Sequence, residues 1–244
     1  MSSGWINWRK NAIILALVEF QVRSMMMLVR PYIPLYLPEL GVVGAVDIAY
    51  WTGLLTSINF VSQAIASPFW GNLADRVGRK LMVIRCVIGM GIFSMLLALA
   101  GNAYQFLIIR FIMGAISGTN AAATTLVATN TPEEHMGYSI GLIQTGFMAG
   151  TLAGPAIGAV VGEVVGYRGS FIFSGIAILF LLPVVLLGVK EDFKPGAKIR
   201  KEKQKLSYDL FKKHNHLLFL LFLMFIAQLS MQGNDAFKNN RNKR

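Results

Sequence analysis

Charged residues and cysteines are both scarce in this 244-residue sequence. Charged residues make up 14% of the chain and hydrophobic residues 55%, whereas soluble domains carry roughly 25% charged residues. A single cysteine, Cys86, leaves no partner for an internal disulfide or a cysteine metal site. The three histidines lie in or beside charged segments without metal-ligand spacing: His135, His214 and His216. The composition is typical of an integral membrane protein, and we expect no metal and no cofactor.

Acidic residues are also few, with 12 of them against 23 lysines and arginines and a net charge of +11. Such a balance can indicate nucleic-acid binding. However, nine of the 23 basic residues lie between Lys190 and Lys213, and others lie at the ends of apolar runs. Basic residues placed in this way set the orientation of a membrane protein. We therefore expect no nucleic-acid partner.

Long apolar runs dominate the first 189 residues. A helix needs about 20 apolar residues to cross a bilayer, and six runs reach this length: 11–37, 48–70, 81–100, 104–128, 138–162 and 168–189. A seventh run, 217–232, has 16 residues and would span about 24 Å of a core about 30 Å thick. We predict a six-helix bundle (1–189), a basic cytoplasmic loop (190–216), an incomplete seventh helix (217–232) and a non-native or frameshifted polar tail (233–244).

Turn residues and basic residues together predict the topology. The turns fall at Gly41, Gly44, Gly101–Asn102, Thr131–Pro132 and Gly166. Basic residues precede the first run and follow the second and the sixth, whereas the loops near 41–47 and 101–103 contain none. Because lysine and arginine accumulate on the cytoplasmic side, we predict a multi-pass protein of the plasma membrane, of the bacterial inner-membrane type, with a cytoplasmic N-terminus.

The segment GNLADRVGRK, residues 71–80, concentrates charge between the second and third runs. Gly71 and Gly78 lack a Cβ atom and allow a tight turn, while Asp75 can pair with an arginine or a helix N-terminus. Arg79 and Lys80 can lie at an anionic lipid surface, with no further role. The segment lacks the pattern of a phosphate-binding loop. We predict a short cytoplasmic hinge.

The same segment resembles the loop 2–3 signature of the major facilitator superfamily. The resemblance implies an all-α integral membrane fold, in which the six helices form the N-terminal bundle of a transporter, a 3+3 inverted repeat. It also implies that the loop gates the cytoplasmic side and bridges two six-helix halves. The matching positions are Gly71, Leu73, Ala74, Asp75, Arg76, Gly78, Arg79 and Lys80.

The fifth run carries glycine at every fourth position from Gly146 to Gly162. Small residues at this spacing let another helix approach closely, and such packing needs no transport role. Gly150, Gly154, Pro155 and Gly158 also resemble the helix-5 motif of drug:proton antiporters, although Ala159 replaces a further glycine. This resemblance implies an exporter.

Several charged residues fall within the predicted helices, among them Glu19, Arg23, Arg30 and Arg110. Glu19, Arg23 and Arg30 share one stripe of the first helix, because they are displaced by about 40° and 20° at about 100° per residue. Glu19 can bind a proton or a cationic substrate, or form an ion pair with Arg23 that locks the helix. Arg110 either faces the interior or extends to the outer interface. Together with Gly114 it is similar to the family's helix-4 signature, whose arginine is implicated in proton coupling.

Further polar residues in the runs can line a cavity or hydrogen-bond between helices. They are Asn59, Gln63, Asn120 and Gln144.

These patterns favour proton-coupled efflux of small molecules, of the multidrug or metabolite exporter type. We expect the chain to be a truncated half that is inactive alone and needs a second six-helix half, with protons, a small-molecule substrate and the bilayer as its other partners. One alternative is a non-transporting remnant or a half that binds another membrane protein. Arg23, Arg30 and Arg110 motivate a second alternative, import of a small anionic solute. The sequence contains no nucleophile–base set and no nucleotide loop, so we do not expect an enzyme.

Overall fold

The computed structural model describes residues 7–191, which lie in one compact unit. Every regular element between these residues is a helix. The predictions for the rest of the basic loop, for the incomplete seventh helix at 217–232 and for the polar tail at 233–244 lie outside the described residues.

The first predicted helix continues to Leu40 but is interrupted by two short 3-10 turns. It comprises α1 (Trp8–Val29), the 3-10 turn η1 (Arg30–Tyr32), α2 (Ile33–Tyr36) and the 3-10 turn η2 (Leu37–Leu40). Each of the three short elements begins with a proline in its first two positions. Since proline lacks a backbone N–H, it interrupts the α-helical hydrogen bonds but is tolerated at the start of a helical segment.

The remaining helices follow the predicted order. They are α3 (Ala45–Val77), α4 (Arg79–Ala98), α5 (Ala103–Ile116), α6 (Thr119–Asn130), α7 (Glu133–Leu179) and α8 (Leu182–Gly188). The predicted turns are confirmed. Gly41 and Gly44 have φ angles of 85° and 108°, and Asn102 caps α5 by accepting a 2.9 Å hydrogen bond from the backbone N of Gln105.

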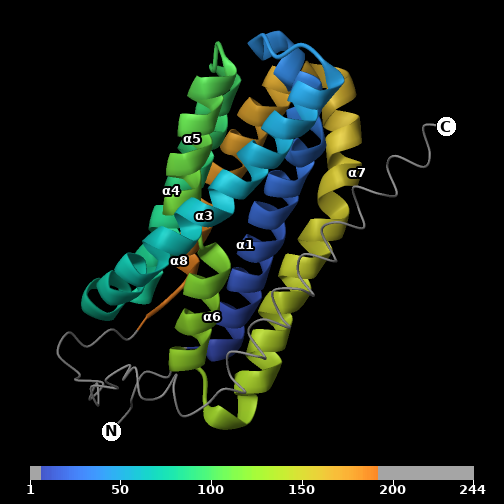
Figure 1. Cartoon of the computed structure of the whole chain (residues 1–244). Coiled ribbons are helices and arrows are strands. Elements are labelled where there is room, and N and C mark those ends of the chain that lie inside the picture. Colours follow the sequence, from blue (N-terminus) through green and yellow to red (C-terminus); the bar gives the residue numbers. More distant parts are fainter. Residues whose placement is uncertain (1–6, 192–244) are drawn as a thin grey trace, which may run out of the picture. The chain divides into compact units, whose positions relative to one another are not determined.

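The run 104–128 lies within one stretch that is apolar enough to cross a membrane, Ala103–Asn130, but its helix is interrupted. It breaks at Ser117–Gly118, where Gly118 has a φ angle of 118° that side chains other than glycine rarely adopt. The predicted turn at Gly166 is confirmed: its φ angle of 69° and ψ angle of −174° are not helical, and the two helices that share the label α7 run up one side of the bundle and return behind it (Figure 1).

Four helical stretches of the described residues are long and apolar enough to cross a membrane. They are Trp8–Leu40, Arg79–Ala98, Ala103–Asn130 and Glu133–Gly188. The last has 56 residues, more than twice the roughly 20 that one crossing requires, and it contains two of the six predicted runs. α3 has 33 residues but is less apolar, so its composition alone does not identify it as a span.

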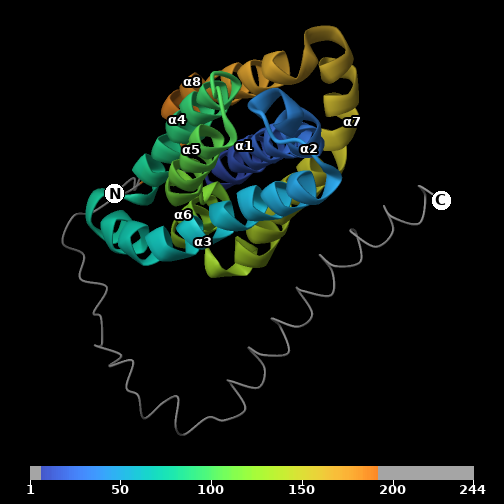
Figure 2. The same ribbon diagram turned by 45° about the horizontal axis from the view of Figure 1, so that its top comes forward.

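α1 is the central helix of the bundle and packs against α7 and α6 (Figure 2). α3 packs mainly on α5, and α4 packs on α5, α6 and α7. An aromatic cluster joins α2, α5 and α7, with the ring centroids of Tyr36, Phe106 and Phe171 separated by 5.6 to 5.9 Å. All three side chains are buried, so this end of the bundle has a continuous apolar core.

Candidate functional site

The glycines of α7 lie directly against the backbone of α1. A Cβ atom added at Gly154 would lie 2.6 Å from the carbonyl oxygen of Ser24, and one at Gly158 would lie 2.7 Å from that of Leu28. Two further α7 glycines meet α1 carbonyls in the same way, Gly146 at Ala16 and Gly150 at Phe20. The four-residue repeat of α7 therefore fits a four-residue repeat of α1, which is the packing role expected of such a stripe.

Beyond Gly158, the side chain of Tyr32 continues the contact between the α1 end and α7. Its hydroxyl donates a hydrogen bond to the carbonyl oxygen of Gly158, and its ring occupies the space beside Gly162. Pro155 lies within α7 without ending the helix. The three glycines of the predicted helix-5 motif thus belong to the α1–α7 contact, whereas Pro155 is exposed, and a role for the motif in antiport stays a prediction.

A cavity of about 370 Å³ lies on the side of α1 that faces α3, α5 and α6. It contains the four charged residues that the sequence singled out within the helices: Glu19, Arg23, Arg30 and Arg110. Three of the predicted polar residues line it as well: Asn59, Gln63 and Asn120. The structure therefore brings residues from four helices to one polar site.

Glu19 is the most deeply buried of these charges, with 1% of its surface exposed. Its carboxylate faces the side chains of Thr119 and Asn120 in the first turn of α6. Its Oε1 atom and the Nδ2 atom of Asn120 are nevertheless buried without a hydrogen-bond partner.

Arg23 does not form the locking ion pair with Glu19 that was one of the predictions. Its Nε atom donates a 3.0 Å hydrogen bond to the hydroxyl of Thr151, and its guanidinium lies 4.3 Å from the ring centroid of Phe147. Within residues 7–191, the ion pairs closer than 4.0 Å are Asp75–Arg79 and Glu39–Arg168. Contacts with α7, supplied by Thr151 and Phe147, explain the orientation of Arg23.

Arg110 faces the cavity, with 7% of its surface exposed. Its Nε atom is buried and has no hydrogen-bond partner. The backbone carbonyl of the same residue accepts a 3.2 Å hydrogen bond from Asn59 of α3. Arg30 is exposed at the end of α1 and lies close enough to repel the charges of both Arg23 and Arg110.

The break between α5 and α6 opens into this cavity. Ser117, Gly118, Thr119 and Asn120 all line it, and no side chain caps the first turn of α6. The sequence analysis missed this feature, although a Ser–Gly pair within an apolar run was an available signal. A helix that begins inside a bundle directs its unpaired N–H groups and the positive end of its dipole at whatever fills the cavity.

The hinge between α3 and α4 is shorter than predicted. α3 continues to Val77, and Gly78 alone forms the turn, with a φ angle of 98°. The prediction was wrong for Gly71, which lies within α3 with open space where a Cβ atom would be. Asp75 and Arg79 form the expected ion pair, at 3.6 Å.

The sequence analysis missed the acceptor that holds the start of α4. Both carboxylate oxygens of Glu191 accept hydrogen bonds of 2.8 Å, one from the backbone N of Arg79 and one from that of Lys80. Lys80 also donates a 2.7 Å hydrogen bond from Nζ to the carbonyl of Leu186 in α8. Glu191 had been assigned to the basic loop, so its pairing with a helix N-terminus was not predicted.

The segment that carries Glu191 is itself fixed to α1. The side chain of Asn11 donates a 2.6 Å hydrogen bond to the carbonyl of Lys190 and accepts one of 3.0 Å from its backbone N. The hinge, the end of α8 and the start of α1 therefore form one hydrogen-bonded junction. Of the other motif residues, Arg76 is exposed on the last turn of α3.

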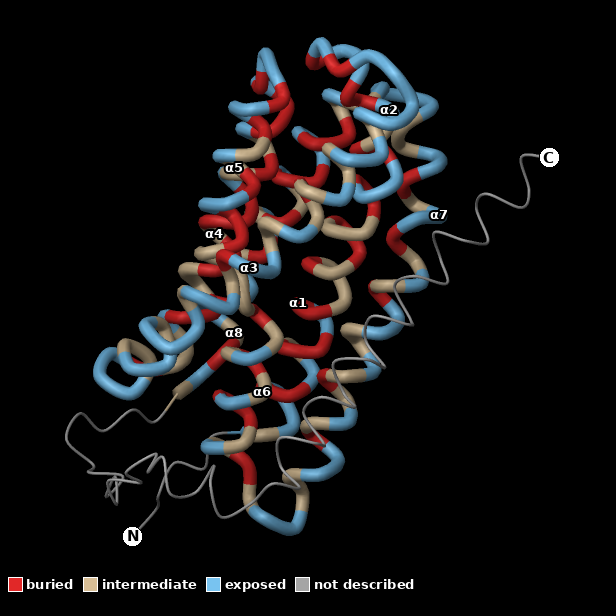
Figure 3. The backbone as a smooth tube through the Cα atoms, viewed as in Figure 1, coloured by how far each residue is buried: buried red, intermediate tan, exposed pale blue. Residues whose placement is uncertain are grey.

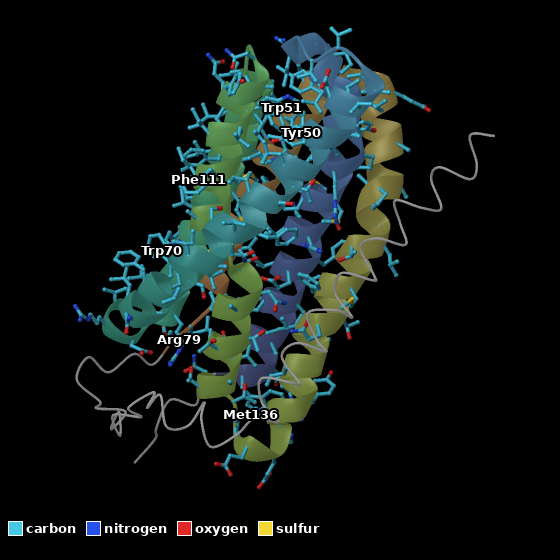
Figure 4. All side chains as sticks on the ribbon, viewed as in Figure 1. Tyr50, Trp51, Trp70, Arg79, Phe111 and Met136 are labelled. Atoms are coloured by element: carbon cyan, nitrogen blue, oxygen red, sulfur yellow. The ribbon has the colours of Figure 1, made fainter. Side chains whose placement is uncertain are left out.

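A second cavity of about 530 Å³ continues from the first towards this junction. The two share Phe60, Gln63, Ser117, Gly118 and Ala121. The guanidinium of Arg85 lies 3.6 Å from the ring centroid of Trp70, whose Nε1 donates a 2.6 Å hydrogen bond to the carbonyl of Ala115. Figure 4 shows Trp70 and Arg79 at the same end of α3 and α4.

Comparisons with known proteins agree with this architecture. Residues 15–236 match the sequence profile of the Major Facilitator Superfamily. The chain belongs to this family of membrane transporters, as the loop 2–3 signature predicted.

The curated relatives include two proteins named multidrug resistance protein MdtG. That of Escherichia fergusonii is 39% identical over 193 residues, which cover 79% of this chain and 47% of the relative. The protein of Escherichia coli strain K12 / DH10B is 40% identical over 193 residues, which again cover 79% of this chain and 47% of the relative. The chain thus spans about half the length of the curated relatives it matches.

A solved structure also has this fold. It is the crystal structure of the human organic anion transporter MFSD10 (TETRAN), with a TM-score of 0.58 and 19% identity over 73% of this chain and 48% of that one. At this identity the likeness concerns the fold alone. The predicted family and the all-α membrane fold are confirmed.

Proposed function

We propose that the protein exports small molecules across the plasma membrane in exchange for protons, with its N-terminus in the cytoplasm. Glu19 is the proposed proton site, and the cavity around it is the proposed substrate site. The hinge at Gly78, with Asp75 and Arg79, is the proposed cytoplasmic gate. The names of the MdtG relatives support the direction of transport.

The burial of Glu19 is the observation that carries this proposal. An ionised carboxylate away from water is costly unless it is paired or fully hydrogen-bonded, yet Glu19 has no ion-pair partner within 4.0 Å in the described part of the chain and one oxygen without a donor. Its charge state therefore depends on whether water reaches the cavity. A protein that opens this cavity to each side in turn would take up a proton on one side and release it on the other.

A second six-helix half is the proposed partner. Alternating access requires one half to move against another around a central site, and the cavity lies within a single bundle, between α1, α3, α5 and α6. The second half would cover the side of the cavity that α3 and α6 leave open. We therefore expect the chain alone not to transport.

Import of a small anion is a second candidate, supported by the three arginines of the cavity. Here a proton on Glu19 would enter together with the solute. The two candidates differ in the direction in which an imposed pH gradient drives the substrate.

Vesicles containing purified protein test these proposals. The chain would be reconstituted alone or with the C-terminal half of the Escherichia coli relative, and dye movement would be recorded under an imposed pH gradient. We expect movement only with both halves, directed against the proton flow. Dye expulsion by the chain alone would contradict the need for a second half, and movement in the direction of proton flow would favour import.

Glu19→Gln in the two-half system tests the proton site. We expect downhill exchange to continue and gradient-driven accumulation to be lost. Glu39→Gln is the matched control, because Glu39 is exposed and pairs with Arg168 outside the cavity. Proton coupling that survives in the Glu19 variant would exclude Glu19 as the carrier.

A further inference from the structure

We infer that the cavity binds an amphipathic organic anion, whose acid group lies among Arg30, Arg110 and the first turn of α6 and whose apolar body lies against the methionines of α1. This inference rests on the proposed function, because it names the substrate class of the proposed transport site.

The charges lining the cavity do not balance. Three arginines face one glutamate there, an excess of two positive charges when Glu19 is ionised. Arg30 repels both Arg23 and Arg110, and none of the three has an ion-pair partner within 4.0 Å among residues 7–191. Like charges in a bundle interior are costly, and an anion between them would remove that cost.

The donors of the cavity are available and directed into it. The Nε atom of Arg110 is buried without a partner in a side chain that is 7% exposed. The first turn of α6, a helix of 12 residues, has no side-chain cap and lines the same cavity. A guanidinium with a helix N-terminus is an arrangement that binds carboxylates, sulfonates and phosphates.

The rest of the lining is apolar and suits an organic body. Met26 and Met27 of α1 and Phe60 of α3 also line the cavity. Methionine is flexible and polarizable, so it packs against apolar groups of different shapes. A volume of about 370 Å³ lies within the range of small-molecule sites, roughly 300–1,000 Å³. An inorganic anion would leave this surface unused.

A lipophilic cation fits this cavity less well. Glu19, the one carboxylate in the lining, is 1% exposed, and three arginines line the same cavity. A cation would therefore face an excess of positive charge there. The inside-negative membrane potential also drives an anion outward, in the direction of the proposed export.

Three ligands that share one apolar body test this inference. They are naphthalene-2-sulfonate, the neutral naphthalene-2-sulfonamide and trimethyl(2-naphthyl)ammonium, offered to the purified chain in a neutral detergent by equilibrium dialysis. We expect the sulfonate to bind roughly tenfold or more tightly than the sulfonamide, as one charge-assisted hydrogen bond would give, and the ammonium compound to bind most weakly.

Arg110→Gln should weaken sulfonate binding roughly tenfold or more and leave sulfonamide binding unchanged. Arg168→Gln is the matched control and should change neither, because Arg168 is exposed, pairs with Glu39 and lies outside the cavity. If Arg110→Gln does not yield a folded protein by size-exclusion chromatography, the exposed Arg30 replaces it as Arg30→Gln, with the same expected loss.

The inference is overturned if the sulfonate shows no saturable binding, if the ammonium compound binds more tightly, or if the Arg110 or Arg30 variant binds the sulfonate as the unmodified chain does. Failure of vesicles to move any substrate against protons would contradict the proposed function and leave this binding result intact. Proton-driven export of the ammonium compound, without sulfonate binding, would uphold the proposed function and reject the anion.

Discussion

α1 and α3 are both long helices of one bundle, but they are held in opposite ways. α1 has a buried residue in every turn, and along one side it contacts the glycines of α7 backbone to backbone. α3 has 33 residues, of which Leu55 and Ser62 are buried. Figure 3 shows this contrast, with buried segments along α1 and exposed ones along much of α3.

The cavity is therefore lined on one side by a closely packed helix, α1 (the fixed wall), and on another by a helix with few buried residues, α3 (the loosely held wall). Close packing resists displacement, because the interior of a protein has little free volume. α3 leaves large apolar side chains uncovered, among them Ile65 and Phe69, and such a surface suits lipid or another apolar helix face. Glu19 and Arg23 thus lie on the fixed wall, while Asn59 and Gln63 lie on the one that can move.

The largest expected effect is on the α1–α7 contact. Gly150→Ala would place a methyl group against the backbone carbonyl of Phe20 and the Cβ atom of Arg23, neither of which can move without shifting α1. We expect a loss of about 3 kcal/mol of stability, measured by thermal unfolding in detergent. Gly141→Ala, on the same helix but in open space, should change stability by less than about 0.5 kcal/mol. Equal effects would refute the close contact.

A smaller effect is expected where α3 crosses α5. Gly114→Ala would press a methyl group onto the backbone of Asn59 and the hydroxyl of Ser62, but α3 can move outward because little covers it. We expect a loss of about 1–2 kcal/mol in the same unfolding measurement. Gly53→Ala, also on α3, is the control, because a Cβ atom at Gly53 would have no other atom within 4 Å. A loss as large as that of the Gly150 variant would show that α3 is as firmly held as α1.

The smallest effect is expected at the hinge that joins α3 to α4. Glu191→Ala removes two hydrogen bonds of 2.8 Å from the first turn of α4, and losing a helix cap costs about 1 kcal/mol. Hydrogen exchange of the Arg79 and Lys80 amides should become faster, while that of amides in the middle of α1 stays the same. Unchanged exchange at residues 79 and 80 would contradict the capping role of Glu191.

Local sequence patterns predicted the helices well because hydrophobic length and glycine turns act within a few residues. Gly41, Gly44, Gly78 and Gly166 all have the positive φ angles that turns require. The patterns failed at Gly118, where the apolar composition of the run concealed a break. Composition describes how a segment partitions into a membrane, whereas the φ angle of one residue decides whether its helix continues.

The candidate site was predictable in its residues but not in its partners. The one-stripe spacing of Glu19, Arg23 and Arg30 placed them on a common face, and a buried charge indicated a cavity. Sequence alone could not show that Arg23 would bond to Thr151, which is 128 residues away, or that Glu191 would cap α4 from 112 residues away. Such contacts depend on the three-dimensional packing of helices that are distant along the chain.

The aromatic cluster of Tyr36, Phe106 and Phe171 has a mechanical consequence. It ties α2, α5 and α7 together at the end opposite Gly78, so this end can serve as a pivot. A helix of 20 residues is about 30 Å long, and a rotation of about 10° around the pivot displaces its far tip by roughly 5 Å. Small slips between these tilted rings would therefore be magnified into an aperture wide enough for a solute at the other end.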